Sequence, residues 1–414
     1  MIKVDELYPF SIVSSIGPTG TIKRLFKNRD YFNSRGYDMT VYANHPAKKS
    51  LFGRKYVFKE MTELPFIKEN SNETTTGSRQ RKQLHFSKLV TFVNDHRLTA
   101  KMFVYRNYYL GKSYINDYIS QNRNPDIVVV HDFISCYLYL KYRKEKRAKV
   151  VQFIHADGDG FEMFLKSKNI TGTSVHRRFQ KIYDFAIDNC DQIVYISKLA
   201  ANKFIDRNPK YAGKVCSVVN GIDDVAPITD AKPSSSYKYR LVCTGGVSPR
   251  KGQWIVVEAM HRMNPEVLKD VHFTVIGSGP DHNVLVERVK EYGIAEHFSF
   301  LGNKPNNEVH ELLCKENIYI LMSNNEGLPI SIIEAMRAGL PVISTRVAGI
   351  PEEVDERNGF LLEPDVDQLI ELLNQLPEYN WEQLGKNSRR RFDEEFTFDI
   401  MKKNYADMFD RLPK

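Results

Sequence analysis

Long apolar runs, paired cysteines and a leader pattern are all missing from this sequence of 414 residues. No apolar stretch approaches the roughly 18 residues of a membrane-spanning helix, so we do not expect an integral membrane protein. The five cysteines are an odd number without a C-x-x-C pair, which excludes a disulfide scaffold and a cysteine zinc site as first hypotheses. The start, MIKVDELYPFSIVSSIG, lacks the basic-then-apolar order of a secretory signal. We therefore expect a cytoplasmic location.

Charge is unevenly distributed along the chain. Residues 1–225 hold 37 Lys and Arg against 22 Asp and Glu, a net of +15, whereas residues 226–414 hold 22 against 29, a net of −7. This asymmetry indicates that the two halves face different partners. A basic half suits anionic lipid headgroups, nucleic acid or a phosphorylated substrate, although an ordinary solvated surface would also produce it.

Strand and helix patterns alternate through both halves. In the first half we predict a helix over 21–34 and short strands at 11–16, 39–43, 126–130, 150–154 and 192–196. The segment 68–82 is polar and predicts a loop, and 224–238 has the composition of a linker. The second half restarts with strands at 239–244, 271–277, 298–301, 318–323 and 342–344. Such alternation predicts an α/β fold with parallel sheets covered by helices on both faces.

The stretch 323–354, SNNEGLPISIIEAMRAGLPVISTRVAGIPEEV, carries the strongest chemical signal. Glu326 follows a predicted strand, and Glu334 lies eight residues later in the next helix. A helix that begins after a strand offers free N–H groups and a positive dipole end to an anion, and Gly327 lets a ligand come close. Carboxylates beside a phosphate site suit a sugar nucleotide. An ordinary β-loop-α unit with a capping glutamate is the simpler alternative.

Glu326 and Glu334, with seven residues between them, resemble the E-x7-E signature of retaining GT-B glycosyltransferases of glycosyltransferase family 4. The neighbouring sequence segments are similar to that family as well; they are EGLPISIIEAMRAGLPVI, AGIPEEV and GFLLEPD. The likeness extends over nearly the whole chain. It includes Thr19-Gly20 ahead of Arg35-Gly36, the strand that starts at Pro125-Asp126, His155 after VVQFI, Ser197, and VVNGID at 218–223.

The resemblance implies a GT-B fold with two Rossmann-like domains that face a central cleft. An acceptor-binding domain would span 1–223, a linker 224–238 and a nucleotide-sugar domain 239–395, and a helix in 396–414 would cross back to the first domain. The reaction would transfer a sugar from a nucleoside-diphosphate sugar with retention of anomeric configuration. We expect a UDP-sugar, because UDP-sugars are common donors in that family. The acceptor would be a growing lipid-linked cell-surface glycan. Neither a metal nor another cofactor is expected.

The resemblance also assigns roles to single residues. His155 would lie near the transferred sugar, Glu326 would hold the hydroxyls of that sugar, and Glu334 would hold the ribose. The other donor-binding residues would be Gly20, Arg250, Lys251, Gly327, Leu328 and Ile330. The family often places an Arg where this chain has Gly246, so we expect Arg250 to supply the second cation beside Lys251.

Other motifs are weaker. Asp157-Gly158-Asp159 could be a D-x-D metal pair, but two carboxylates are too common to show this, and we expect Asp157 to contact an acceptor hydroxyl. His131 follows a strand and is a second, weak candidate for acceptor binding. Gly277-Ser278-Gly279 lacks the third glycine of a dinucleotide motif. No nucleophilic Ser/His/Asp or Cys/His set stands out.

Three basic and aromatic runs, 78–88, 101–112 and 141–149, suit an interfacial surface. Because the family often builds lipid-linked glycans, we favour peripheral contact with the inner face of the cell membrane over nucleic acid. Two other functions stay open. One is a GT-B enzyme on a small soluble acceptor, or a sugar-nucleotide epimerase. The other is a catalytically silent partner subunit, for which Gly246 is the only support.

Overall fold

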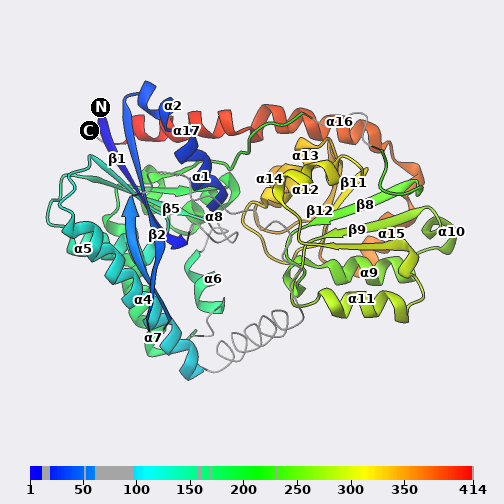
Figure 1. The fold of residues 1–414 in the computed structure, drawn as a ribbon, viewed down its shortest axis with the longest axis horizontal. Coiled ribbons are helices and arrows are strands. Elements are labelled where there is room, and N and C mark those ends of the chain that lie inside the picture. Colours follow the sequence, from blue (N-terminus) through cyan, green and yellow to red (C-terminus); the bar gives the residue numbers. More distant parts are fainter. Residues whose placement is uncertain are drawn as a thin grey trace. The chain divides into compact units, whose positions relative to one another are not determined.

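A computed structural model describes the chain over residues 1–11, 19–50, 53–60, 97–155, 160–167, 170–226, 228 and 232–412. The chain divides into two compact units, and we describe each by itself (Figure 1). The first unit contains Met1–Val219 and Lys402–Lys414, and the second contains Asn220–Met401. The predicted loop at 68–82 lies outside the described residues.

The first unit has a seven-stranded sheet with the order β3-β2-β1-β4-β5-β6-β7. Its strands are β1 (Ile2–Ser11), β2 (Tyr37–Ser50), β3 (Gly53–Glu60), β4 (Ile127–Val130), β5 (Lys149–Ile154), β6 (Gln192–Tyr195) and β7 (Val215–Ser217). Neighbouring strands are parallel except for the antiparallel pair β2 and β3. The parallel part confirms the predicted α/β architecture.

Helices fill the connections of the first unit. They are α1 (Thr19–Lys27), α2 (Arg29–Ser34), α4 (Arg97–Ser120), α5 (Phe133–Tyr142), α6 (Gly160–Ser167), α7 (Ser174–Asn189), α8 (Lys198–Arg207) and the 3-10 turn η1 (Pro209–Lys214). Side chains cap three of them: Asp132, Thr173 and Ser197 accept hydrogen bonds from backbone N–H groups at the starts of α5, α7 and α8. The last helix of the chain is α17 (Phe398–Asp410).

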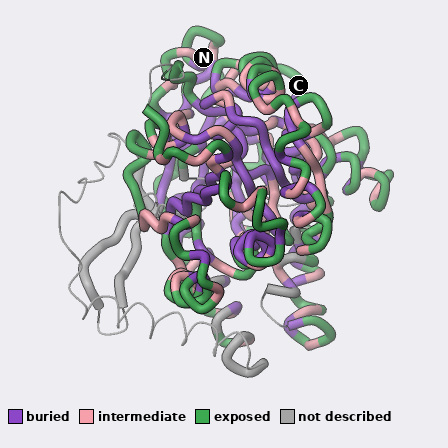
Figure 2. The backbone as a smooth tube through the Cα atoms, turned by 90° about the vertical axis from the view of Figure 1, so that its right-hand side faces the viewer, coloured by how far each residue is buried: buried purple, intermediate pink, exposed green. Residues whose placement is uncertain are grey.

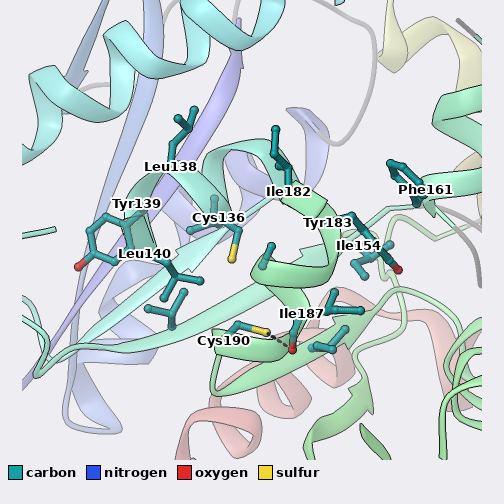
Figure 3. Packing of buried hydrophobic residues seen from close by; sticks show 14 of the residues in the cluster. Cys136, Leu138, Tyr139, Leu140, Ile154, Phe161, Ile182, Tyr183, Ile187 and Cys190 are labelled. Atoms are coloured by element: carbon teal, nitrogen blue, oxygen red, sulfur yellow. Dashed lines mark hydrogen bonds between the residues drawn. The ribbon is translucent and has the colours of Figure 1, made fainter. Parts of the chain in front are cut away.

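The core of the first unit lies where α5 and α7 pack against the sheet. Figure 3 shows Cys136 and Leu138 of α5 near Ile182 and Tyr183 of α7, and all four side chains are buried. Strands β4 and β6 are apolar or neutral and buried at every position, as expected for parallel strands that are covered on both faces. Figure 2 colours the backbone by burial, with the buried residues in purple gathered in the interior and the exposed residues in green at the periphery.

The first strand begins earlier than predicted. β1 runs over Ile2–Ser11, whereas the strand predicted at 11–16 lies, from residue 12 onward, outside the described residues. The strand over residues 2–10 was not predicted, because Asp5 and Glu6 made this segment resemble surface. Both carboxylates are in fact buried, at 1% and 0% exposure. Tyr118 and Arg123 donate hydrogen bonds to Asp5, and partners like these remove most of the cost of burying a charge.

The second unit has a six-stranded, fully parallel sheet with the order β10-β9-β8-β11-β12-β13. Its strands are β8 (Tyr239–Thr244), β9 (Val271–Ile276), β10 (Phe298–Gly302), β11 (Ile318–Leu321), β12 (Val342–Thr345) and β13 (Gly359–Leu362). Five of these strands, β8 to β12, agree closely with the strands predicted from the sequence, whereas β13 was not predicted. The order reverses between β8 and β11, because the chain proceeds outward through β9 and β10 on one side and through β12 and β13 on the other.

Helices cover both faces of this second sheet. They are α9 (Gln253–Arg262), α10 (Pro265–Leu268), α11 (His282–Glu291), α12 (Asn306–Leu313), α13 (Ile330–Arg337), α14 (Ile350–Glu353), α15 (Val366–Asn374) and α16 (Trp381–Arg391). Short turns are η2 (Pro249–Lys251), η3 (Ala295–His297), η4 (Leu376–Glu378) and η5 (Phe392–Phe396). In Figure 1, α9, α11 and α15 lie on one face, and α12, α13 and α14 lie on the other. Within the described residues, no helix is long and apolar enough to cross a membrane.

Candidate functional site

The loops after β8 and β11 lie side by side at the point where the strand order of the second sheet reverses. Open α/β sheets bind ligands outside the carboxyl ends of the strands at this point. The two loops are tied together directly, because the backbone N–H of Asn324 donates to the carbonyl oxygen of Arg250 at 3.0 Å. Most of the sequence-predicted donor-binding residues lie in these two loops and the helix that follows.

Glu326 gathers two cations at one carboxylate oxygen. Its Oε1 lies 2.6 Å from Lys251 Nζ and 2.9 Å from Arg250 Nη1, and Ser323 Oγ donates to the same oxygen at 2.9 Å. The Lys251 and Glu326 side chains are only 12% and 9% exposed, whereas Arg250 is 51% exposed. Charge-assisted bonds of this kind are short and strong. Two cations on one carboxylate leave a net positive charge at the end of the sheet.

Helix α13 begins immediately after this loop. Pro329 stands at its N-cap and no side chain caps it, so the first turn presents backbone N–H groups of the type that bind anions. Leu328 is buried, and Gly327 and Ile330 are partly buried at this start. Glu334 is the fifth residue of α13, about one turn from its start, and its side chain is partly exposed.

Two glycines allow the backbone to pack closely here. A Cβ on Gly349 would lie 2.2 Å from the carbonyl oxygen of Gly327, to which the Gly349 N–H donates at 2.9 Å. Gly252 has φ +67, and a Cβ there would lie 1.9 Å from the carbonyl oxygen of Met322. Neither position accepts a larger residue without movement of backbone. These close backbone contacts fix the positions of the loops that carry Lys251 and Glu326.

Gly246 has no such constraint. A Cβ on Gly246 would find its nearest neighbour, the carbonyl oxygen of Ser278, at 4.0 Å. The Gly246 carbonyl oxygen accepts a hydrogen bond from the Gln253 side chain at 3.1 Å. The backbone therefore has room for a side chain where the family often has an Arg, and in this chain Arg250 supplies the second cation beside Glu326.

Glu353, at the end of α14, was not predicted as a site residue. Its side chain is fully buried, and neither carboxylate oxygen has a hydrogen-bond partner among the residues that the structure describes. Burial raises the pKa of Glu353 well above its ordinary 4.5, and the negative charges of Glu326 and Glu352 raise it further. The only sequence signal was the paired acid in AGIPEEV. A neutral carboxyl group therefore lies near the Glu326 cluster.

The first unit contains a second constellation, built at the ends of β4 and β5. His131 follows β4 and His155 follows β5, and His131 Nδ1 lies 2.9 Å from His155 Nε2. On its other side, His131 Nε2 lies 2.8 Å from Glu6 Oε2. Tyr405 of α17 donates from its hydroxyl to Glu6 Oε1 at 2.5 Å. Glu6, His131 and Tyr405 are buried, and His155 is partly buried.

Burial decides the charge of the groups in this constellation. It lowers the pKa of His155 well below 6.5, and the neighbouring His131 lowers it further. It raises the pKa of Tyr405 well above 10.0, with the charge of Glu6 as the next cause. His155 is consequently a neutral ring. Both ring nitrogens of His131, the weak acceptor-binding candidate, are engaged inside the protein.

The remaining predicted residues are placed as follows. Gly20 was predicted in a loop, but it is the second residue of α1 and is exposed. Asp157, with Asp159 of the same D-x-D pair, lies outside the described residues. Glu6 and Tyr405 were missed because 399 positions separate them, and no local pattern relates residues so far apart.

Comparisons with known proteins agree with this architecture. The family description "Glycosyltransferase Family 4" matches residues 29–225, and "Glycosyl transferases group 1" matches residues 227–395. Among curated proteins, the chain is 26% identical over 251 residues to a phosphatidylinositol N-acetylglucosaminyltransferase subunit of Arabidopsis thaliana, a match that covers 58% of this chain and 55% of that protein. It is 26% identical over 307 residues to N-acetyl-alpha-D-glucosaminyl L-malate synthase of Bacillus anthracis, at 70% and 76% coverage. The chain thus spans about half the length of the first of these relatives.

Solved structures show the same fold. Sucrose-phosphate synthase of Thermosynechococcus elongatus superposes with a TM-score of 0.69 at 16% identity, over 100% of this chain and 99% of that one. HepE of Anabaena, solved in complex with UDP, superposes with a TM-score of 0.63 at 14% identity, over 99% and 100%. Two glycosyltransferase family models thus match the two halves of the chain in order, and its fold is that of GT-B glycosyltransferases.

Proposed function

We propose that this chain transfers a sugar from a nucleoside-diphosphate sugar to a glycan acceptor, with retention of anomeric configuration. The observation that carries the proposal is the cluster of Lys251, Arg250 and Glu326 at the strand-order reversal of the second sheet. Cations can neutralise the charge of a diphosphate, and a carboxylate can accept hydrogen bonds from sugar hydroxyls. This cluster supplies both kinds of group beside the start of α13, which no side chain caps.

The cluster suggests how the donor is held. In the ligand-free protein, Glu326 is the counter-charge of Lys251 and Arg250. A bound diphosphate would become the partner of these cations and release Glu326 oxygens to accept hydrogen bonds from sugar hydroxyls. As the bond between sugar and diphosphate breaks, negative charge grows on the leaving group. Preorganised cations and helix N–H groups stabilise that charge, which is the main source of catalysis in such reactions.

His155 contributes through its neutrality. The departing sugar carries positive charge in an oxocarbenium-like transition state. A cationic imidazole nearby would oppose that charge, whereas a neutral imidazole with a lowered pKa does not. We propose that the His155 ring or its carbonyl oxygen lies beside the transferred sugar.

We propose UDP as the nucleotide and a lipid-linked glycan as the acceptor. HepE of Anabaena and TarM of S. aureus were solved with UDP, which supports UDP. The name of the Arabidopsis relative includes phosphatidylinositol, and the net charge of +15 in residues 1–225 suits an anionic membrane surface. A small soluble acceptor is the second candidate, because the name of the well-covered Bacillus relative includes L-malate.

Thermal unfolding against UDP, GDP, ADP and their sugars, with and without EDTA, tests the donor proposal. A ligand at about 100 times its Kd stabilises the native state by about 2.7 kcal/mol, which is easily measured. We expect one nucleotide family to raise the Tm, equally with EDTA, and Lys251→Met to lose most of that rise. Arg262→Met, which removes an exposed pair with Asp367, is the matched control. A rise that vanishes with EDTA contradicts the metal-free site.

The acceptor proposal has its own test. Sedimentation with vesicles of neutral or anionic phospholipid separates the two candidates, since a peripheral enzyme binds the anionic vesicles and releases them as salt increases. Transfer of labelled sugar into an organic-solvent extract then identifies a lipid-linked product. Product that stays in the aqueous phase, with no vesicle binding, favours the small soluble acceptor.

A further inference from the structure

Four side chains, three of them buried, form a continuous hydrogen-bonded line in the first unit. They come from β1, from the end of its neighbour β4, from the end of the next strand β5, and from α17. The line runs from the Tyr405 hydroxyl to Glu6, from Glu6 to His131, and from His131 to His155. Only the last member, His155, is partly exposed. A chain of this kind connects a buried carboxylate to an imidazole that a ligand can reach.

The bonding pattern fixes where the protons lie. The Tyr405 hydroxyl donates to one oxygen of Glu6, and His131 Nε2 lies 2.8 Å from the other, an arrangement that suits an ionised carboxylate, which only accepts. A fully buried carboxylate needs an opposite charge. Among the described residues no Lys or Arg makes an ion pair with Glu6, and His131 is the one basic group bonded to it. To supply this counter-charge, His131 would carry protons on both nitrogens.

The protonation of His131 determines which nitrogen of His155 carries the proton. The Nδ1–H of a doubly protonated His131 donates to His155 Nε2, across 2.9 Å. His155 Nε2 is then an acceptor, and the single proton of this neutral ring lies on Nδ1. The lowered pKa of His155 agrees, since burial and the charge of His131 both oppose a second proton. No described residue hydrogen-bonds to His155 Nδ1.

Aromatic packing holds the two rings in this orientation. His131 and His155 stack with centroids 5.2 Å apart and an interplanar angle of 21°. Phe153 stacks against His131 at 5.5 Å and against Tyr405 at 5.2 Å. Tyr8 meets the His131 ring edge-on at 5.7 Å. The rings of the line cannot rotate freely, so the proton positions are set by the bonds described above.

We propose that Glu6 and His131 are positioning residues that keep the proton of His155 on Nδ1, so that His155 donates a hydrogen bond to a hydroxyl oxygen of the transferred sugar. This inference rests on the proposed function for the identity of the ligand, but not for the position of the proton. In many metal and protease sites, a carboxylate that hydrogen-bonds to one nitrogen of an imidazole determines which nitrogen carries the proton. In this chain a second imidazole stands between the two.

The neighbouring residue provides a matched control. Asp5 is also buried, at 1% exposure, but it bonds to Tyr118 and to Arg123, whose guanidinium supplies its counter-charge. Asp5 and Glu6 point to opposite faces of β1, as successive strand residues do. Asp5→Asn removes a buried carboxylate of the same strand that does not belong to the line, so it reports the structural cost alone.

NMR of the full chain with 15N-labelled histidine tests the proton position. Long-range 1H–15N correlations near neutral pH identify the protonated nitrogen of His155, and the signals are assigned with His155→Asn. We expect Nδ1–H in the unmodified protein. In Glu6→Gln the counter-charge is gone, His131 keeps only its Nε2 proton, and His155 must donate from Nε2, so the tautomer switches. Asp5→Asn should leave it unchanged.

Several outcomes would overturn the proposal. Nε2–H in the unmodified protein contradicts it without any variant, and so does an unchanged tautomer in a folded Glu6→Gln protein. Tyr405→Phe keeps the ring and removes one donor to Glu6; it is the milder variant if Glu6→Gln does not fold. It should shift the His155 signals, and signals identical to those of the unmodified protein count against the line.

Kinetics separate this inference from the proposed function. Glu6→Gln should lower kcat for sugar transfer about 10- to 100-fold, which is the usual effect of losing a residue that orients a metal-ligating side chain. The affinity for the nucleoside diphosphate alone, measured by calorimetry, should not change. A switched tautomer without any turnover in the unmodified protein would refute the proposed function and leave the proton position standing. A switched tautomer with unchanged kcat would refute the role of His155 as a donor.

Discussion

Lys251 Nζ lies 2.6 Å from Glu326 Oε1, and both side chains are nearly buried at the ends of adjacent parallel strands. A buried cation and carboxylate in this position form a preformed but replaceable pair. Removal of one partner leaves the other charge uncompensated. Under our proposal, the pair exchanges partners when a nucleotide sugar binds.

The first prediction concerns the carboxylate of this pair. Glu326→Ala should reduce turnover of the nucleotide sugar by about 100-fold or more, as expected when a group that acts on the transition state is lost. Binding of the nucleoside diphosphate alone should persist, because Lys251 and Arg250 remain. Turnover assays and calorimetry measure the two effects. Glu382→Gln, which breaks an exposed pair with Lys386, is the control, and equal losses in both variants would contradict the role.

The second prediction ranks the two cations. Lys251→Met should weaken diphosphate binding more than Arg250→Met, because Lys251 is 12% exposed and Arg250 is 51% exposed to solvent. Water and salt screen an exposed charge more effectively. Titrations of UDP at two salt concentrations test the ranking. The reverse order would show that Arg250, and not Lys251, is the main contact of the diphosphate.

The third prediction tests the close approach of the two loops. Gly349→Ala places a Cβ 2.2 Å from the Gly327 carbonyl oxygen, so the loop must move, and we expect at least a 10-fold loss of turnover, about the effect of a small misplacement of binding groups. Gly213→Ala is the control, since a Cβ on Gly213 has no neighbour within 4 Å. If Gly349→Ala keeps normal turnover, the geometry of this loop is not needed.

The fourth prediction concerns the pH dependence of stability. The folded-state pKa of Glu353 is raised above 4.5, so between the unfolded and folded pKa values the native state binds more protons than the unfolded state. Stability then falls as pH rises through that window. Glu353→Gln removes the titration, so its stability relative to the parent should increase as pH rises above about 4.5 and level off at higher pH.

Thermal unfolding in a series of buffers measures this difference. Glu382→Gln is the control with the opposite sign, because Lys386 lowers the pKa of the exposed Glu382. A difference between Glu353→Gln and the parent that does not vary with pH would show that Glu353 is not held neutral in the native state.

The sequence predicted best what local patterns encode. β8 was predicted at its observed bounds, because Tyr239–Thr244 is a short β-rich run between polar segments. Arg250, Lys251 and Glu326 were each named, and the strand order explains why they meet. The strand over residues 2–10 was missed, because Asp5 and Glu6 hide a buried strand, and α1 begins two residues before the predicted helix start at 21, so that it includes Gly20.

What the sequence could not predict depends on contacts between distant segments. Tyr405 reaches Glu6 across 399 positions, and only the folded chain shows that the carboxylate is compensated. The burial of Glu353 could not be predicted either, because it follows from the packing of α14 against neighbouring elements and not from the local sequence PEEV. Buried polar groups of this kind contradict the simple rule that charge indicates surface, and both cases lie beside proposed functional residues.

Release of the diphosphate from nucleotide sugars is the most direct test of the central claim. UDP-, GDP- and ADP-sugars are incubated with the protein, with and without a membrane extract as acceptor source, and the anomeric configuration of the product is read by NMR. We predict that one nucleotide sugar is consumed with retention, that EDTA has no effect, and that Glu326→Ala is inactive while Glu382→Gln is not. No consumption of any nucleotide sugar, or equal consumption by Glu326→Ala, would contradict the account.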